Sequence, residues 1–297
     1  MWFPSPRRRA LLSAAIVAIL LIPATARATD EADSTVAVPV AQRDALVYHV
    51  RSTVEITSRR YLIADEHTPW QILHGILSLR YDFRIKEDGK KINAVRWMSE
   101  GVTHRGEPWF EKTRFGGRAH PYTKAMEFEG HPNQTLAILA MAGLPPEHEL
   151  QVEGGTITIA DIVRNSQQEV QRNEEPTWTL WALSRYLEPD AEWINRHNEP
   201  WSIERLVQWQ TEEAVNNQAA CGGTHGLFAL AFALDQYRKK TGNEPRGVWL
   251  EADQKLQRYI AEARALQNRD GSFSALYFAG PRHTDDVNDR VATTGHV

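Results

Sequence analysis

The chain has 297 residues, and its 38 acidic residues outnumber its 34 basic ones, which gives a formal net charge of −4 at pH 7. This balance repels phosphate backbones and argues against nucleic acid as a partner. A single cysteine, Cys221, excludes an internal disulfide, so the hydrophobic core must hold the fold together.

The N-terminus has the layout of a secretory signal peptide. Arg7–Arg9 precede an apolar run of 13 residues, Ala10–Ile22, and small residues follow up to Ala28. The run is shorter than the roughly 18 residues of a membrane span. We therefore expect cleavage after Ala28, export to the periplasm or the medium, and no stable membrane span afterwards. Cleavage removes four arginines and leaves a net charge of −8. The alternative is an uncleaved signal that anchors the protein to a membrane.

A linker and one helical domain are expected after the signal. Residues 29–39 are small and acidic and lack a hydrophobic period, as in a linker. Residues 40–297 form the helical domain, which begins with helical apolar spacing over Val40–Leu62. Thr68-Pro69-Trp70-Gln71 then provides the capping residue, the first-turn proline and the returning glutamine of a helix start.

Two β-hairpins are predicted between the helices. Glu87–Lys90 and Gly154-Gly155 each separate two short mixed runs, as hairpin turns do. Between these hairpins, Thr103–Gly130 has no period, and a loop of that length in a compact domain is usually functional. A capping-box spacing joins Thr158 to Asp161 at the start of the following helix.

Apolar helix starts recur along the chain. They fall near His74, His131, Trp178, His225 and His296, and two successive intervals are 47 residues long. Such spacing is typical of helical-hairpin repeats, in which each hairpin has an apolar inner helix and an amphipathic outer one. Because the chain stops at Thr294–Val297, where another helix should begin, we expect the domain to be truncated at its C-terminus.

The segment Leu266-Gln267-Asn268-Arg269-Asp270-Gly271-Ser272-Phe273 resembles the repeat of squalene/terpenoid cyclases and protein prenyltransferases. The resemblance implies an α/α toroid whose inner helices surround a cavity. It also implies that four residues tie an outer helix to the next inner one: Gln267, Asp270, Gly271 and Phe273. Glycine permits a tight turn, the polar side chains can satisfy helix-end groups, and Phe273 can anchor the turn in the core. We expect a mainly α fold, either an α/α toroid or an open helical-hairpin repeat array, with one or two small β-hairpin insertions.

Four histidines lie at or near predicted helix starts: His74, His131, His225 and His296. In a toroid they could converge at one mouth. Imidazoles gathered there could bind Zn²⁺, and His131 or His225 could act as a general base. The competing interpretation is local, with each imidazole bonded to the backbone or facing solvent.

Two acidic segments are further candidates. Asp285-Asp286-Val287-Asn288-Asp289 matches the Asp-Asp-x-x-Asp pattern in which carboxylates hold Mg²⁺ in class I prenyl-diphosphate enzymes. A second acidic motif is missing, so we favour a solvated polar loop and keep Asp285 and Asp286 as alternative catalytic candidates. The paired carboxylates of Glu127-Phe128-Glu129-Gly130-His131 could do acid–base work on a glycoside, and here too we favour a solvated loop.

Aromatic and thiol side chains complete the candidates. Trp178 and Trp181 are three residues apart and share one helix face, which suits an aromatic wall for a ligand or an ordinary core. Cys221 precedes Gly222-Gly223 and could be a nucleophile at a helix N-terminus. We favour a small buried residue at a tight turn.

The leading functional prediction is a binding or scaffold module with a cavity at the helix-start end. The acid motif of class II cyclases, Asp-x-Asp-Asp, does not occur in the chain. The alternatives are an enzyme of the terpenoid cyclase or prenyltransferase type and a toroidal glycan hydrolase or lyase. The expected partner is a small apolar molecule, a glycan or a protein ligand, and the sequence leaves the cofactor open.

Overall fold

The computed structural model describes residues 40–120, 127–172 and 174–297, so the predicted signal peptide (1–28) and linker (29–39) lie outside the described residues. The chain divides into two compact units, of which the second is Thr53–Val297. Helix α1 (Val40–Ser58) contains the described part of the first unit, which confirms the predicted first helix. Its apolar side chains Val47, Val50 and Val54 are exposed. Among the described residues, no helix combines the length and the apolar character that a membrane crossing requires.

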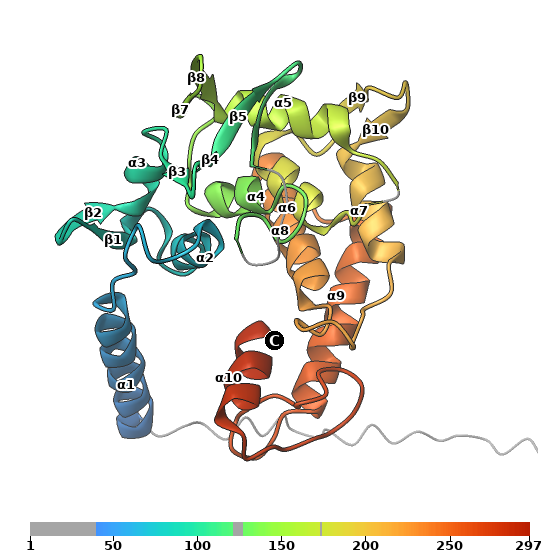
Figure 1. Ribbon diagram of the computed structural model, residues 1–297. Coiled ribbons are helices and arrows are strands. Elements are labelled where there is room, and N and C mark those ends of the chain that lie inside the picture. Colours follow the sequence, from blue (N-terminus) through green and yellow to red (C-terminus); the bar gives the residue numbers. More distant parts are fainter. Residues whose placement is uncertain (1–39, 121–126, 173) are drawn as a thin grey trace, which may run out of the picture. The chain divides into compact units, whose positions relative to one another are not determined.

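The helices of the second unit alternate between two positions. Apolar inner helices pack one against the next along the chain: α2 (Pro69–Leu79), α4 (Gln134–Met141), α6 (Thr177–Tyr186) and α8 (Thr224–Thr241). Outer helices follow them in turn: α3 (Ala94–Met98), α5 (Ile159–Glu169), α7 (Ile203–Glu212) and α9 (Val248–Ala265). A ninth helix of this unit, α10 (Val287–His296), follows α9 (Figure 1). The prediction of a mainly α fold is confirmed.

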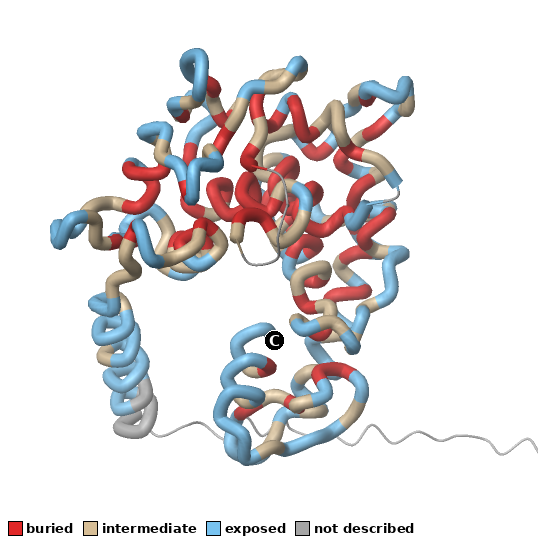
Figure 2. The backbone as a smooth tube through the Cα atoms, in the orientation of Figure 1, coloured by how far each residue is buried: buried red, intermediate tan, exposed pale blue. Residues whose placement is uncertain are grey.

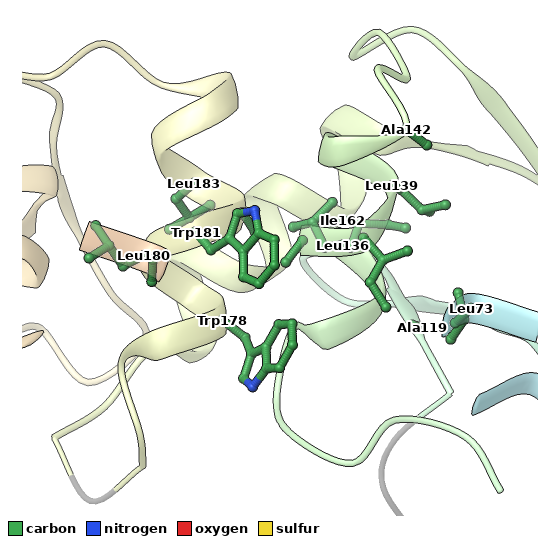
Figure 3. Packing of buried hydrophobic residues seen from close by; sticks show 14 of the residues in the cluster. Leu73, Ala119, Leu136, Leu139, Ala142, Ile162, Trp178, Leu180, Trp181 and Leu183 are labelled. Carbon is green, nitrogen blue, oxygen red and sulfur yellow. The ribbon is translucent and has the colours of Figure 1, made fainter. Parts of the chain in front are cut away.

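The core is centred on the inner helices α4 and α6, which are buried on almost all sides. Every residue of α4 from Gln134 to Ala140 is buried, and so is every residue of α6 from Thr177 to Ser184 (Figure 2). The outer helices α5 and α7 bury one face only, as amphipathic helices do. Figure 3 shows Leu136 of α4 and Trp181 of α6 in the same packed layer.

The described residues form five two-stranded antiparallel sheets beside the helices, more than the one or two hairpins that the sequence predicts. Hairpins β1–β2 (Arg84–Glu87, Lys90–Asn93) and β7–β8 (Glu149–Val152, Gly155–Thr158) confirm the two predicted ones. The other sheets pair β3 with β4 (Thr103–His104, Glu107–Pro108), β5 with β6 (Phe110–Thr113, Gly116–Ala119) and β9 with β10 (Glu192–Ile194, Pro200–Ser202). The predicted loop over Thr103–Gly130 is therefore wrong for residues 103–119. Strands of two to four residues are too short to show a period of two in the sequence.

Three of these hairpins show what the repeating unit is. In each case an inner helix is followed by a hairpin, and the residue that ends the hairpin caps the next outer helix: Asn93, Thr158 and Ser202. Each side-chain oxygen accepts the N–H of the residue three positions later, at 2.9–3.2 Å. Such caps satisfy free helix N–H groups. The repeat is thus inner helix, hairpin and outer helix, and it occurs three times.

The helix boundaries follow the predicted capping signals at most positions. Thr68 forms the predicted capping box, since its Oγ1 accepts the Gln71 N–H and its own N–H donates to Gln71 Oε1 at 3.0 Å. Gly242 ends α8 in the left-handed region, at φ +67°. The prediction of a helix start near His296 is wrong, because His296 is the last residue of α10, which Asp286 caps.

The segment 267–273 forms a closed turn after α9. The Gln267 amide donates to the Gly271 carbonyl at 2.9 Å, and Asp270 Oδ1 accepts the N–H and the hydroxyl of Ser272. The turn contacts α10 through an Asp270–Arg290 ion pair of 3.1 Å and a bond from the Phe273 N–H to a threonine hydroxyl. Phe273 itself is half-buried and lies outside the main core, so the expectation that it anchors the turn there is wrong.

Gly271→Ala should lower the free energy of unfolding by about 1–2 kcal/mol, because a Cβ is unfavourable in the left-handed region. Gly271 has φ +85°, and nothing lies within 4 Å of the position that a Cβ would take, so the cost is backbone strain alone. Gly271→Asn should cost less, since asparagine tolerates this region. Urea denaturation compares the variants, and equal stability of wild type and Gly271→Ala would contradict this geometry.

Candidate functional site

A series of contacting rings joins the starts of three inner helices to the end of α10. His131, which precedes α4, stacks on Trp178 of α6 with ring centroids 5.6 Å apart. Trp178 contacts His225 of α8 at 5.1 Å, and His225 contacts His296 at 5.4 Å. Four elements that are distant in sequence therefore bring three of the predicted histidines together.

His74 lies on the second turn of α2, and the charges of two other histidines affect its pKa. Its ring packs on Trp70 at 3.9 Å, and its Nδ1 bonds to the Trp70 carbonyl at 2.7 Å. Burial lowers the pKa of His74, and charges on His225 and His296 lower it further. Ring contacts thus bring His131, His225 and His296 together, whereas the ring of His74 packs on Trp70 and is linked to the others only through the charges of His225 and His296. Among the described residues, no group of three or more His, Cys, Asp or Glu side chains is arranged to hold a metal ion.

The two tryptophans of α6 form part of the core and part of this face. Their rings are nearly parallel, with centroids 5.0 Å apart, and Trp181 contacts Phe228 of α8 at 4.4 Å. Trp178 is only 1% exposed, yet neither Trp178 Nε1 nor Trp181 Nε1 has a hydrogen-bond partner within the described part of the chain (Figure 3). A buried indole N–H usually has a partner, so these two buried donors depart from the usual pattern.

A cavity of about 440 Å³ opens beside this ring series. Its lining combines the segment before α4, the start of α6, the end of α7 and the start of α8 with the residues that precede them, through His131, Glu175, Thr177, Gln210, Cys221 and His225. The lining mixes polar side chains with apolar ones. The buried Thr177 hydroxyl donates to Gln210 Oε1 at 2.8 Å, which joins α6 to α7 beneath the cavity.

His131 and Glu175 form an ion pair at the edge of the cavity. His131 Nδ1 lies 2.9 Å from Glu175 Oε2. The hydrogen bond to Glu175 raises the pKa of His131 and outweighs burial, which acts in the opposite direction. Burial instead lowers the pKa of His225. The pKa values of His131 and His225 are therefore shifted in opposite directions. Acid–base pairs in functional sites often have pKa values that differ in this way.

Glu175 is a residue that sequence reasoning missed. It stands directly before Pro176, in front of the first turn of α6. The helix dipole favours acidic residues just before a helix, so the position of Glu175 is the one sequence feature that could have pointed to it. Its partner His131 is 44 positions away, so the pairing itself has no local signature.

Cys221 lies in a tight turn just before α8. Gly222 and Gly223 have φ of +59° and +78°, and the Thr224 N–H and hydroxyl both donate to the Cys221 carbonyl, at 3.1 and 2.8 Å. The predicted tight turn is present. Cys221 is half-buried and lines the cavity, so the expectation of a buried residue is wrong.

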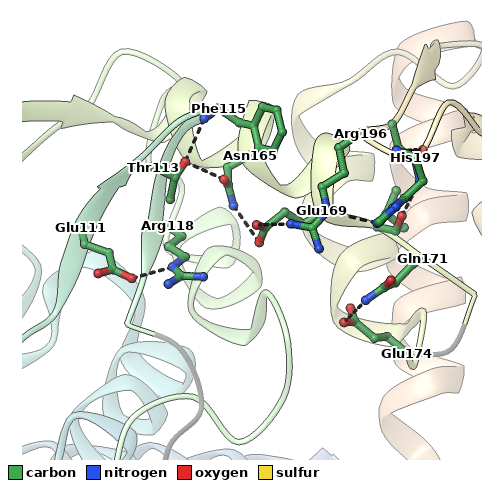
Figure 4. A network of polar contacts seen from close by, with 12 residues as sticks. Glu111, Thr113, Phe115, Arg118, Asn165, Glu169, Gln171, Glu174, Arg196 and His197 are labelled. Carbon is green, nitrogen blue, oxygen red and sulfur yellow. Dashed lines mark hydrogen bonds and ion pairs between the residues drawn. The ribbon is translucent and has the colours of Figure 1, made fainter.

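A second, smaller pocket of about 160 Å³ lies between α4 and α5. Its lining includes Arg118, Glu129, Asn165, Glu169 and Arg196. Figure 4 shows Asn165 between a threonine hydroxyl and Glu169, which also pairs with Arg196 at 3.2 Å.

Glu129 corrects the prediction of a solvated acidic loop over residues 127–131. Its side chain is only 7% exposed, and its Oε1 accepts the Thr135 N–H at 2.7 Å in the first turn of α4. Burial raises the pKa of Glu129 to about 7. Glu127 instead forms an ion pair with Arg105.

The second acidic candidate lies elsewhere. Asp286 accepts the N–H groups of Asn288 and Asp289 as the cap of α10, and Asp285 is exposed. Neither lines the cavity beside His131. Asp286 thus has a structural role that any helix start requires.

Comparison of the chain with family models, with curated proteins and with solved structures gives no match.

Proposed function

We propose that this protein is a helical-hairpin repeat protein of the α/α-toroid type that binds a small amphipathic molecule at the helix-start ends of its inner helices. The succession of inner helix, hairpin and outer helix supports the repeat architecture. The signal-peptide layout of residues 1–28 supports an extracytoplasmic location.

The ring series from His131 to His296 is the observation that carries the proposal. Aromatic faces contact flat or apolar portions of a ligand, and a few placed polar groups fix its orientation. The half-buried His225 ring lines the 440 Å³ cavity and offers such a group. Trp178, whose Nε1 has no partner among the described residues, packs against both His131 and His225 of that lining.

The lining favours an amphipathic ligand over a wholly apolar isoprenoid. Arg172, Glu175, Gln210 and Asn216 all face the cavity. Displacing water from these groups by a hydrocarbon would leave polar atoms without partners, which costs free energy. A ligand with hydroxyl, amide or carbonyl groups avoids that cost.

His225→Ala should abolish ligand binding with little change in melting temperature. The test is an NMR screen of sugars and amphipathic fragments that follows the indole N–H signals, in which a ligand should shift the Trp178 signal in the wild type only. His197→Ala, on the exposed β9–β10 turn, is the matched control and should bind as the wild type does. Absence of any ligand-induced shift in the wild type, or full binding by His225→Ala, would refute the proposed function.

A further inference from the structure

The chain's only thiol, Cys221, and the ion-paired imidazole of His131 line the same cavity. We propose that Cys221, His131 and Glu175 form a nucleophilic site that cleaves an ester or amide of the bound ligand through a thioester on Cys221. This inference rests on the proposed ligand-binding function. It assigns the ligand a carbonyl group, and it gives the three side chains the roles of nucleophile, base and positioning residue.

Glu175 determines which nitrogen of His131 can act as a base. The Glu175 carboxylate accepts the Nδ1–H of His131 over 2.9 Å, so the lone pair of the neutral ring lies on Nε2. The Trp178 ring stacks on the imidazole at an interplanar angle of 29° and fixes its plane. Orientation of a base by a carboxylate is the arrangement that nucleophilic hydrolases use on unrelated folds.

The backbone around Cys221 is fixed at the mouth of the cavity. The Thr224 N–H and hydroxyl hold the Cys221 carbonyl, and the Tyr277 hydroxyl donates to the preceding carbonyl, of Ala220, at 2.5 Å. Gly223 and Gly226 of the adjoining helix start also line the cavity. The N-terminus of α8, a helix of 18 residues, therefore faces the space where an oxyanion would form and would stabilise its charge.

Glu175 and Cys221 both raise the pKa of His131. The hydrogen bond to Glu175 is the largest cause of the raised pKa of His131, and the charges of Glu175, Cys221 and Glu129 act in the same direction. A thiolate on Cys221, in the same cavity, thus favours the imidazolium form of His131. Cysteine nucleophiles are activated by a neighbouring histidine in this way.

The reaction that follows needs only water as co-reactant. The Cys221 thiol gives its proton to His131 Nε2, and the sulfur forms a bond to the carbonyl carbon. The bond from that carbon to the leaving oxygen or nitrogen breaks, and the leaving group takes the proton from His131. Water then adds to the thioester with His131 as base, the C–S bond breaks, and the proton returns to the Cys221 thiol. The products are a carboxylic acid and an alcohol or amine.

The test uses p-nitrophenyl acetate as a probe ester and mass spectrometry of the intact chain. Since Cys221 is the only thiol, acetylation there is identified by its absence in Cys221→Ser. Native Cys221 should acetylate at least about tenfold faster than the same thiol in the urea-unfolded chain, although it is half-buried. General-base assistance is worth roughly 10²-fold or more, so His131→Gln should lose about that factor.

Glu175→Gln tests the positioning role independently of rate. It should lower the pKa of His131 measured by NMR titration and slow acetylation, whereas Glu153→Gln, on the exposed β7–β8 turn outside the cavity, should change neither. Acetylation no faster than in the unfolded chain would overturn the inference, as would normal rates in a folded His131→Gln or Glu175→Gln.

Failure of this inference is distinguishable from failure of the proposed function. Cys221→Ser should still show the ligand-induced shift of the Trp178 indole signal. Ligand binding by the wild type with a slow, His131-independent thiol would remove the nucleophilic site and leave the binding function. Fast, His131-dependent acetylation without any ligand-induced shift would support the nucleophilic site and refute the proposed function.

Discussion

Gly222→Ala should destabilise the protein by roughly 2–5 kcal/mol, because both the backbone and the packing at Gly222 exclude a side chain. Gly222 has φ +59°, and a Cβ there would lie 2.1 Å from Cγ of Tyr277. Tyr277 has little room to retreat. It is itself held at φ +54°, and its hydroxyl donates to the Ala220 carbonyl at 2.5 Å. Urea denaturation measures the loss.

Gly242→Ala is the matched control, since it separates strain from collision. Gly242 has φ +67° but nothing within 4 Å of a Cβ, so its substitution should cost only about 1–2 kcal/mol. Gly222→Ala combined with Tyr277→Ala should lose less stability than the sum of the two single changes, because removal of the ring relieves the clash. Equal losses in Gly222→Ala and Gly242→Ala would show that the Tyr277 ring does not press on this turn.

Local signals in the sequence were sufficient for most of the secondary structure. The Thr68 capping box, the Thr158–Asp161 box and the Gly242 cap are each formed by residues within four positions of one another, and all are present. The hairpins at Glu87–Lys90 and Gly154-Gly155 were predictable for the same reason, since a short turn fixes its own strands.

The candidate site depends on contacts that no local pattern encodes. His131 meets Glu175 across 44 positions, and Thr177 meets Gln210 across 33. The recurrence of histidines at helix starts points to His131 and His225. It does not show that His131 is ion-paired with Glu175. The sequence places a helix start near His296, whereas the helix begins after Asp286 and ends at His296, because the acidic segment 285–289 caps a helix instead of forming a loop.

Burial gives Glu129 a raised pKa that the sequence does not reveal, because nothing in the sequence distinguishes Glu129 from the other glutamates. Its environment also predicts a pH dependence of stability. Burial raises the pKa of Glu129 from 4.5 to about 7, against the opposing effect of the Thr135 N–H. Between these pH values the folded chain retains a proton that the unfolded chain has released. The stabilisation is therefore complete below about pH 4.5 and is lost as the pH rises through about 7.

Glu129→Gln should remove this loss, because the amide stays neutral and its oxygen can still accept the Thr135 N–H. A change of 2 to 3 pKa units corresponds to about 3 kcal/mol, so the variant should gain about that much relative to wild type between pH 4.5 and pH 8. Burial lowers the pKa values of His74 and His225, which gives an opposite slope below pH 6.5. That slope is common to both proteins and cancels in the difference.

The measurement is urea denaturation of both proteins at steps of pH, with Glu153→Gln on the exposed β7–β8 turn as control. The control should follow the wild-type curve at every pH. The charge of Glu129 also contributes to the raised pKa of His131, so His131 should titrate at a lower pH in Glu129→Gln, as NMR would show. Parallel stability curves for wild type and Glu129→Gln would mean that the Glu129 carboxylate is solvated, and the second pocket would then have no buried acid.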